Sequence, residues 1–418
     1  MTGLLTGRLG TLALPRHAPD RLREALGLAP GAPLRLAYVT GPGDVVGTYA
    51  RWLEGRDDER GAKLSYSGMF YDLADAVRAE ALVAHMTPAD VNVPTEGPAR
   101  FVETPMAWGG TKLRFQRAAF AHARRAARAL RPFAPHATVV GADTAFSWLP
   151  LLPGRIVLSV HNTFWPADTD PSAARLARLR AAPGLPMRAR AAGAVAISEA
   201  CAGQLATLTR RSDLPTRILQ PQFPGSPPPL AKGRAEGQGV LYVGRIETAK
   251  GVFDLLRAAE TVREEMPGLT LTFAGDGAAR ATLERAATGM AWVRILGHVA
   301  GEKVRALLGE ADVLVCPTRR GFNEGLATVG IEALIQGVPS IVSSVVPAGR
   351  TLGDAALVFP ADDTDALGAC LAKTLRRGPV RDGLLAAARG AGREAFYDRT
   401  NAWGTGVYDV LTGRPGRS

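Results

Sequence analysis

Long apolar runs, paired cysteines and low-complexity tracts are scarce in this chain of 418 residues. The longest apolar runs are strand-sized and are broken by Arg, Gly or Pro, which excludes the roughly 18 to 20 apolar residues of a membrane-spanning helix. Arg8 and Arg16 interrupt the apolar N-terminus, so no export signal is predicted. The cysteines, Cys201, Cys316 and Cys370, are far apart and lack CxxC spacing, which argues against a disulfide framework and a structural zinc site. We therefore expect a globular, cytoplasmic protein with free thiols.

Signatures of two cofactor classes are also missing. A dinucleotide dehydrogenase needs a GxGxxG turn after its first strand and an acidic residue at the end of the second strand. Neither half of the chain has this combination, which disfavours such an enzyme. No DxD-like pair lies in a loop suited to a divalent cation. We expect neither a bound cofactor nor a metal ion.

Acidic residues are outnumbered, and the excess of base lies mainly in the first half. The formal charge is +11, and residues 1–220 hold 27 Lys and Arg against 18 Asp and Glu. A helix-forming stretch at 112–131 contains seven basic residues and no acid. Such a stretch is either a solvated helix face or a surface attracted to anionic lipid headgroups at the inner face of a membrane. Nucleic acid is not expected, because aromatic residues do not interleave with the charges as a stacking platform requires. Three- and four-residue steps place the following arginines on one face: Arg114, Arg117, Arg124, Arg128 and Arg131.

Short β-branched runs alternate with Ala-rich helical stretches along most of the chain. This alternation predicts parallel sheets covered on both faces, in two Rossmann-like domains. A stretch at 221–238 contains five prolines and continues neither periodicity, so it is the predicted linker. We predict a lead-in at 1–30, a first domain at 31–220, a second domain at 239–395, and a tail at 396–418 that docks on the first domain. Predicted strands lie at 34–40, 137–140, 155–160, 192–197, 216–219, 240–244, 269–275, 293–297, 312–317, 339–344 and 355–359.

The first chemically informative motif is GRIETAKG at 244–251, between a predicted strand and a helix. Ligands of doubly wound sheets bind where strands end and helices begin, and the open N–H groups there favour anions. Arg245 and Lys250 add two cations at the same place. Together they suit a diphosphate leaving group, whose charge grows as its bond breaks.

The second motif is NEGLATVGIEAL at 323–334, which follows another predicted strand. Eight residues of helix separate Glu324 from Glu332, a rise of about 12 Å. Carboxylates this far apart do not flank one glycosidic bond as a hydrolase pair does. They can instead accept hydrogen bonds from sugar hydroxyls at two points of a long ligand. The first helical N–H groups after Gly325 can face a phosphate.

The two motifs, 73 residues apart between Gly251 and Glu324, resemble those of retaining glycosyltransferases of family 4, also called glycosyl transferases group 1. The similarity covers about residues 238–375 and includes AGDG at 274–277 and LGHV at 296–299. It implies a GT-B fold, in which two Rossmann-like domains face each other across a cleft. It also implies transfer of a sugar from a nucleotide diphosphate-sugar.

The resemblance further implies a role for individual residues. Arg245 and Lys250 would hold the donor diphosphate, Glu324 would bind hydroxyls of the donor sugar, and Glu332 would hold the ribose. Gly244 belongs to the same turn as the two cations. The loop after Glu324 would contact sugar and phosphate, and the base would lie beside the loop that follows 293–297. These loop residues are Gly325, Leu326, Ala327 and Thr328, and His298 and Val299.

Two features of the first half complete the predicted site. His161 follows the strand at 155–160, where an imidazole can bond a sugar hydroxyl or share in proton movement. Similar enzymes often have Asp after this histidine, whereas this chain has Asn162. The turn at 41–47 contains Gly43, which would let backbone approach the diphosphate. Segments 108–110 and 319–322 are further candidates for acceptor contact.

We predict a hexosyltransferase that moves a sugar, with retention, from UDP- or GDP-sugar to a hydroxyl of a saccharide, a lipid-linked saccharide or a small molecule. Catalytic roles fall to Glu324, His161, Arg245 and Lys250. A sugar-nucleotide epimerase or an inverting transferase of the same fold is one alternative. A basic protein that binds anionic lipid or nucleic acid and keeps a vestigial donor site is another.

Overall fold

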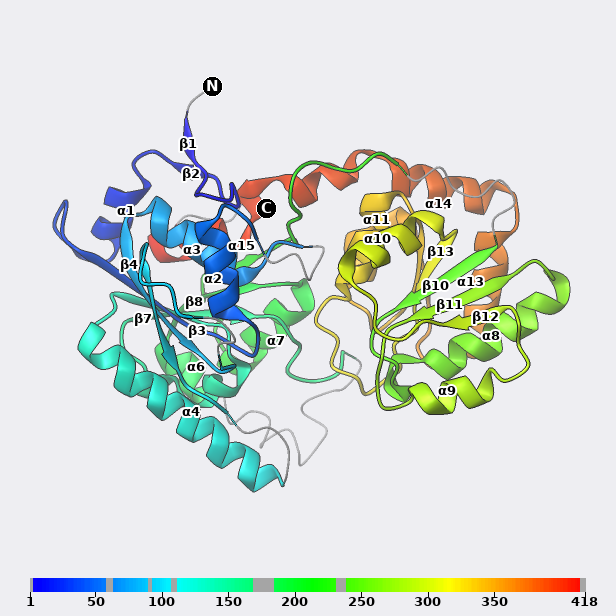
Figure 1. Ribbon diagram of the computed structural model, residues 1–418, viewed down its shortest axis with the longest axis horizontal. Coiled ribbons are helices and arrows are strands. Elements are labelled where there is room, and N and C mark those ends of the chain that lie inside the picture. Colours follow the sequence, from blue (N-terminus) through cyan, green and yellow to red (C-terminus); the bar gives the residue numbers. More distant parts are fainter. Residues whose placement is uncertain are drawn as a thin grey trace.

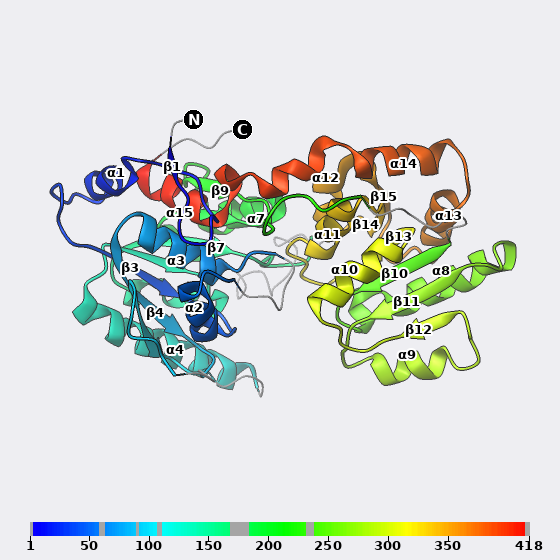
Figure 2. The ribbon, with the colours of Figure 1, turned by 45° about the horizontal axis from the view of Figure 1, so that its top comes forward.

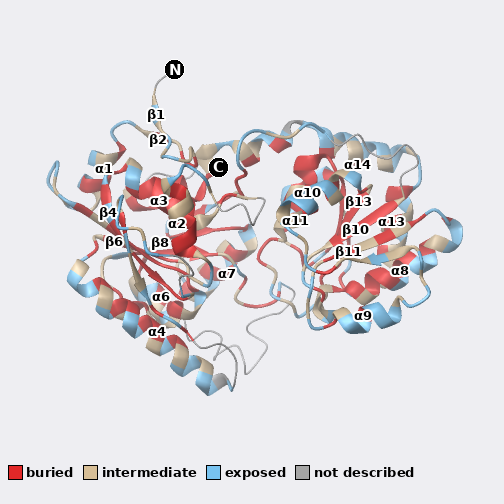
Figure 3. Ribbon diagram, in the orientation of Figure 1, coloured by how far each residue is buried: buried red, intermediate tan, exposed pale blue. Residues whose placement is uncertain are grey.

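The computed structural model describes residues 3–57, 63–88, 92–106, 111–167, 184–230 and 238–413. It has two lobes side by side, each built on one parallel sheet (Figure 1). Strands lie in the centre of each lobe and helices cover both faces, so buried residues concentrate on the strands (Figure 3). The predicted α/β fold of two doubly wound domains is confirmed.

The sheet of the first lobe has seven parallel strands in the order β5-β4-β3-β6-β7-β8-β9 within the described residues. Its central strands are alanine- and valine-rich and buried on both faces, as parallel strands are. The strands are β3 (Leu34–Val39), β4 (Ala79–His85), β5 (Ala99–Glu103), β6 (Ala137–Val140), β7 (Arg155–Val160), β8 (Ala191–Ala196) and β9 (Thr216–Ile218).

The first lobe's helices are α1 (Ala18–Ala25), α2 (Val45–Leu53), α3 (Tyr66–Ala76), α4 (Lys112–Phe133), α6 (Gly184–Arg190) and α7 (Glu199–Thr209), with the 3-10 segment η1 (Asp143–Leu151). A short antiparallel pair, β1 (Leu4–Leu5) and β2 (Leu14–Pro15), precedes them.

The second lobe has six parallel strands in the order β12-β11-β10-β13-β14-β15. They are β10 (Gly239–Val243), β11 (Thr270–Ala274), β12 (Val293–Ile295), β13 (Val313–Cys316), β14 (Ser340–Ser343) and β15 (Ala356–Phe359). Its helices are α8 (Val252–Glu265), α9 (Arg280–Ala286), α10 (Gly301–Glu310), α11 (Thr328–Gln336), α12 (Ala348–Leu352), α13 (Thr364–Leu375) and α14 (Pro379–Arg389), with 3-10 segments η2 (Thr248–Lys250) and η3 (Gly353–Ala355).

The end of the chain returns to the first lobe (Figure 2). After η4 (Ala391–Tyr397) and η5 (Arg399–Asn401), helix α15 (Trp403–Thr412) packs against β8 and α3. Trp403, Val407 and Tyr408 are buried in the first lobe's core. A separate hydrophobic cluster contains residues of both lobes. None of the helices in the described ranges combines the length and apolar character that a bilayer crossing requires.

Strands β4 and β5 have no counterpart among the predicted strands. The sequence of β4, AEALVAH, contains alanine and glutamate, which have low strand propensity. The strand forms because β3 and β5 pair with it on either side.

Candidate active site

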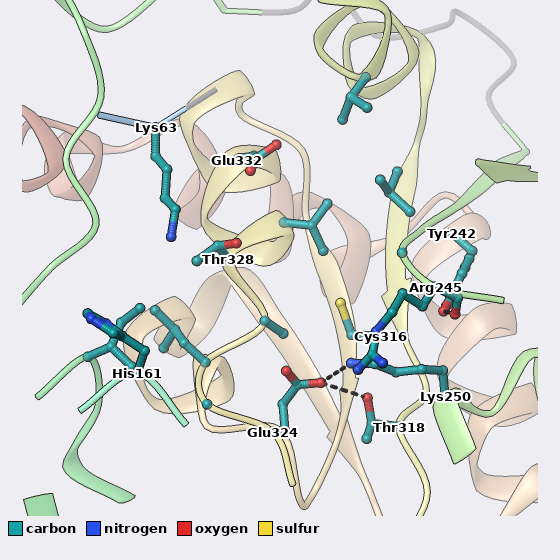
Figure 4. A pocket seen from close by; sticks show the side chains of 18 of the residues that line it. Lys63, His161, Tyr242, Arg245, Lys250, Cys316, Thr318, Glu324, Thr328 and Glu332 are labelled. Atoms are coloured by element: carbon teal, nitrogen blue, oxygen red, sulfur yellow. Dashed lines mark hydrogen bonds and ion pairs between the residues drawn. The ribbon is translucent and has the colours of Figure 1, made fainter. Parts of the chain in front are cut away.

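The carboxyl ends of strands from both lobes line one cavity of about 540 Å³. The second lobe contributes the residues after β10 and β13 together with the start of α11, and the first lobe contributes the residues after β7. Figure 4 shows Glu324, Lys250 and Arg245 in the second lobe and His161 on the opposite wall. All four residues predicted to be catalytic therefore line this one cavity.

The turn after β10 is tight because of Gly251. This residue has a φ of +72°, and a Cβ atom on it would lie 1.9 Å from the carbonyl oxygen of Pro317. Only glycine fits both conditions without a backbone shift. The close approach brings Lys250 to the end of β13, beside Thr318.

Lys250 forms an ion pair with Glu324, and the hydroxyl of Thr318 donates to the same carboxylate oxygen at 3.2 Å (Figure 4). The side chains of Lys250 and Glu324 are only 16% and 11% exposed. Water screens such a pair little, so each charge depends on the other. The two motifs predicted to bind one ligand are thus joined directly.

Arg245 is more open, with 61% of its side chain exposed. Its guanidinium pairs with Glu247 at 2.8 Å and lies 5.3 Å from the ring centre of Phe322. The ammonium of Lys250 lies 4.3 Å from the same ring. Two cations therefore share one aromatic platform at the mouth of the cavity.

The loop between Glu324 and α11 touches the first lobe. The hydroxyl of Ser198 donates to the carbonyl oxygen of Gly325 at 2.8 Å, and a Cβ on Gly325 would lie 2.1 Å from the carbonyl oxygen of His161. Ala327 has a φ of +65°, and α11 begins after it without a side-chain cap. The first N–H groups of α11 are thus left for a ligand in the cavity. The side chain of Leu326 is buried in the core, so this residue offers only its backbone.

Glu332 lies further along α11 and lines the same cavity. Burial raises its pKa to about 7, although the charges of Lys63 and Arg305 oppose that rise. Lys63 belongs to the first lobe and lies on the side of the cavity that faces Glu332 and Thr328 (Figure 4). Lys63 cannot be identified as a site residue from sequence, because it stands in no motif and reaches the cavity only when the lobes meet.

The ring of His161 is held by a polar contact and by an aromatic neighbour. Its Nε2 lies 2.8 Å from the hydroxyl oxygen of Ser159, which in turn accepts a hydrogen bond from the indole N–H of Trp403 at 2.7 Å. The ring of Tyr66 stacks on the imidazole with centroids 4.1 Å apart. Burial, with the charge of Lys63, lowers the pKa of His161 to about 3, so the ring is neutral at pH 7. Its Nδ1 is buried and has no partner within the described ranges.

Two predicted donor residues lie elsewhere. Gly43 does not line this cavity; its N–H donates to Thr87 at 3.0 Å in an adjoining cavity of the first lobe. His298 is exposed beside Asp276, whereas its neighbour Val299 does line the cavity between the lobes. The loop after β12 therefore turns its valine inward.

Of the two candidate acceptor segments, the structure describes only 319–322. Arg319 pairs with Asp254 at 3.4 Å and with Asp362 at 3.0 Å, and all three belong to the second lobe. Phe322 is the platform under the two cations. Segment 108–110 lies outside the described residues.

Comparison with known proteins places the second lobe in a family. Residues 237–377 match the model of Glycosyl transferases group 1. The O-antigen chain mannosyltransferase B of Escherichia coli is 33% identical over 181 residues, which are 42% of this chain and 46% of that protein. The D-inositol 3-phosphate glycosyltransferase of Salinispora tropica is 30% identical over 194 residues, 42% of this chain and 37% of that protein. The chain thus spans less than half the length of these relatives.

Solved structures resemble nearly the whole chain. WaaG, a glycosyltransferase involved in lipopolysaccharide biosynthesis, has a TM-score of 0.61 at 14% identity, over 90% of this chain and all of WaaG. Anabaena HepE in complex with UDP and glucose has a TM-score of 0.57 at 15% identity, over 91% of this chain and 97% of HepE. These likenesses show that the two lobes form a GT-B fold.

Proposed function

From the premise that the second lobe is a Glycosyl transferases group 1 domain, we propose that the protein is a hexosyltransferase of glycosyltransferase family 4. It moves a sugar, with retention of configuration, from UDP- or GDP-sugar to an acceptor hydroxyl in glycan biosynthesis. The observation that carries the proposal is the cavity between the lobes, where two cations, an uncapped helix start and two carboxylates meet.

The donor binds along α11 in this proposal. The diphosphate is bound by Arg245, Lys250 and the first N–H groups of α11, because each places a full or partial positive charge in the same part of the cavity. Glu324 accepts hydrogen bonds from the transferred sugar, and Glu332 accepts them from the ribose. The likeness to a fold that holds UDP and glucose in HepE supports a nucleotide-sugar in this position.

In the transfer itself, the acceptor oxygen forms a bond to the anomeric carbon, and the bond from that carbon to the diphosphate oxygen breaks. The electron pair leaves with the diphosphate, which gains negative charge as the bond lengthens. The proton of the acceptor hydroxyl ends on the departing diphosphate. Lys250 and Arg245 stabilise that growing charge, so this proposal requires no divalent cation.

The test begins with binding. Thermal-shift and calorimetric titration with UDP, GDP and ADP select the nucleotide, since a bound nucleotide stabilises the folded chain by mass action. Arg245→Ala is expected to weaken the selected nucleotide at least tenfold, while Arg294→Ala, an exposed arginine on β12 away from the cavity, leaves affinity unchanged. Equal affinity in both variants would count against this site.

The test continues with turnover of the matching nucleotide-sugar, with and without acceptor. Chromatography of the donor separates transfer from epimerisation and from hydrolysis, and the anomeric proton coupling of the product reports retention or inversion. Glu324→Gln is expected to lower the rate at least 100-fold, while Glu302→Gln on α10 keeps it. An epimerised donor, or an inverted product, would replace the proposal with one of its alternatives.

A second proposal concerns the outer face of α4, at the lower edge of the first lobe in Figure 1. Leu113 and Phe120 are 61% and 38% exposed there, on the same side as exposed arginines at 117, 124 and 131. Apolar groups between cations suit peripheral contact with an anionic membrane. Vesicles with 30% phosphatidylglycerol should pellet the protein at low salt, and Arg124→Glu with Arg128→Glu should abolish this. Pelleting with neutral vesicles alone would overturn the idea.

A further inference from the structure

A second cavity, of about 620 Å³, lies in the first lobe directly beside the donor cavity. The two cavities share Tyr66, His161 and Asn162 as lining residues. Molecules bound in the two cavities would therefore lie next to each other at these three residues. The strand ends of β3, β6 and β7 form its floor.

The walls of this cavity combine hydroxyls, apolar surfaces and carboxylates. Hydroxyls come from Thr40, Ser65 and Ser67, and apolar surface comes from Met86 and Phe115. Its charged side chains within the described residues are both acidic, Asp44 and Asp143. This is the reverse of the outer surface of the lobe, where arginines dominate.

The two carboxylates differ in what they can offer. Asp44 caps α2 by accepting from the N–H of Gly47 at 2.8 Å, and it pairs with Arg51 at 3.2 Å. Asp143 follows β6 and accepts one hydrogen bond, at 3.0 Å, from the side-chain amide of Asn162. No lysine or arginine of the described residues pairs with Asp143, and its side chain is open to the cavity.

The position of Asp143 is fixed next to the junction of the cavities. Asn162 directly follows His161, so the amide that holds Asp143 belongs to the same strand end as the imidazole. One carboxylate oxygen of Asp143 is occupied by Asn162, and the other is free for a ligand hydroxyl. Protein around the carboxyl raises its pKa, and the hydrogen bond from Asn162 opposes that rise.

We propose that the acceptor is an uncharged saccharide and that Asp143 binds it by accepting a hydrogen bond from one of its hydroxyls. This inference rests on the proposed function and specifies its acceptor. The carboxylate of Asp143, which has no cationic partner among the described residues, repels a phosphorylated or uronic-acid group, whereas a sugar hydroxyl donates to it. Phe115 and Met86 cover the apolar faces of the sugar ring, and Ser65 and Ser67 serve its remaining hydroxyls.

The test measures binding without requiring turnover. Saturation-transfer NMR with the intact chain compares methyl α-glucoside, methyl α-mannoside and methyl α-galactoside with their 6-phosphates. At least one neutral glycoside is expected to bind at least tenfold more tightly than its phosphate. Asp143→Asn should weaken the neutral glycoside at least tenfold, while Asp75→Asn, an exposed carboxylate of α3 away from both cavities, leaves it unchanged.

Calorimetric titration of the nucleotide separates this inference from the proposed function. Nucleotide affinity within twofold of wild type in Asp143→Asn, with weakened glycoside binding, supports a role confined to the acceptor. Tighter binding of the phosphates than of the neutral glycosides would overturn the inference, and so would equal glycoside affinity in Asp143→Asn and wild type. Either result does so at any measured nucleotide affinity. A chain that binds glycosides at Asp143 but no nucleotide would refute the donor proposal and keep the acceptor site.

Discussion

Replacing Gly325 by alanine tests whether the contact between the lobes sets the geometry of the donor loop. The added Cβ would lie 2.1 Å from the carbonyl oxygen of His161, about 1.3 Å short of ordinary contact. The backbone fixes the position of a Cβ atom, and the carbonyl of His161 is itself backbone, so no side-chain rotation relieves the clash. If the lobes separate by that amount, the 2.8 Å hydrogen bond from Ser198 to Gly325 is lost. That bond is worth about 1 kcal/mol, but a displacement of about 1 Å at reacting groups costs about 100-fold in rate.

We therefore expect kcat/KM of Gly325→Ala to fall about 100-fold with the selected donor and acceptor, with a much smaller loss of nucleotide affinity. Gly309→Ala is the matched control. Gly309 lies in α10, where an added Cβ meets nothing within 4 Å, so activity is kept and stability rises by up to about 1 kcal/mol. Steady-state kinetics measures kcat/KM, and calorimetric titration measures nucleotide affinity. Retention of more than a third of wild-type kcat/KM by Gly325→Ala would refute the reasoning.

Three further outcomes follow from the same contacts. Lys250→Met leaves the carboxylate of Glu324 buried without its cation, so the free energy of unfolding measured by urea titration should fall by about 3 kcal/mol. The double variant Lys250→Met with Glu324→Gln should recover most of that loss. A double variant no more stable than Lys250→Met alone would contradict this prediction. Burial raises the pKa of Glu332 from 4.5 to about 7, so the folded chain holds the proton more tightly than the unfolded chain, and stability should fall as pH rises from about 4.5 to 7. Thermal unfolding of Glu332→Gln should lack this decline, and an unchanged pH profile would argue against it. Trp403→Phe removes the hydrogen-bond donor to Ser159 but keeps an aromatic ring, so kcat should fall several-fold while nucleotide affinity stays constant. If the NMR chemical shifts of His161 match those of wild type, Ser159 does not transmit an effect of Trp403 to His161.

Much of the fold follows from local pattern. The strands with β-branched runs, such as β7 and β10, are visible in sequence because each is buried on both faces and consists mostly of consecutive apolar residues. The alanine-rich β4 and the arginine-containing β5 lack that pattern. Their strand conformation comes from pairing within the sheet, a tertiary effect that propensity does not contain.

The same division holds in the site. Glu324, Lys250 and Arg245 were predicted because each stands in a local motif at a strand end. Lys63 stands in no motif, and its presence in the cavity depends on how the lobes meet. Asp143 did carry a signal, since it lies three residues beyond β6 at the edge where ligands of parallel sheets bind. The loop containing His298 could not be oriented from sequence, because a single residue of register decides whether histidine or valine faces inward.

The chemistry of the two cavities is divided between the lobes, and the division explains why their contact matters. Arg245, Lys250 and the uncapped start of α11 belong to the second lobe, while Lys63 and the carboxylate of Asp143 belong to the first. A donor diphosphate would be drawn to the cations of the cavity between the lobes, and the acidic residues of the second cavity would not attract it. In this proposal the reacting atoms meet where the cavities join, at Tyr66, His161 and Asn162. Because Ser198 donates to Gly325 and the carbonyl of His161 packs closely against it, the first lobe sets the position of the loop after Glu324.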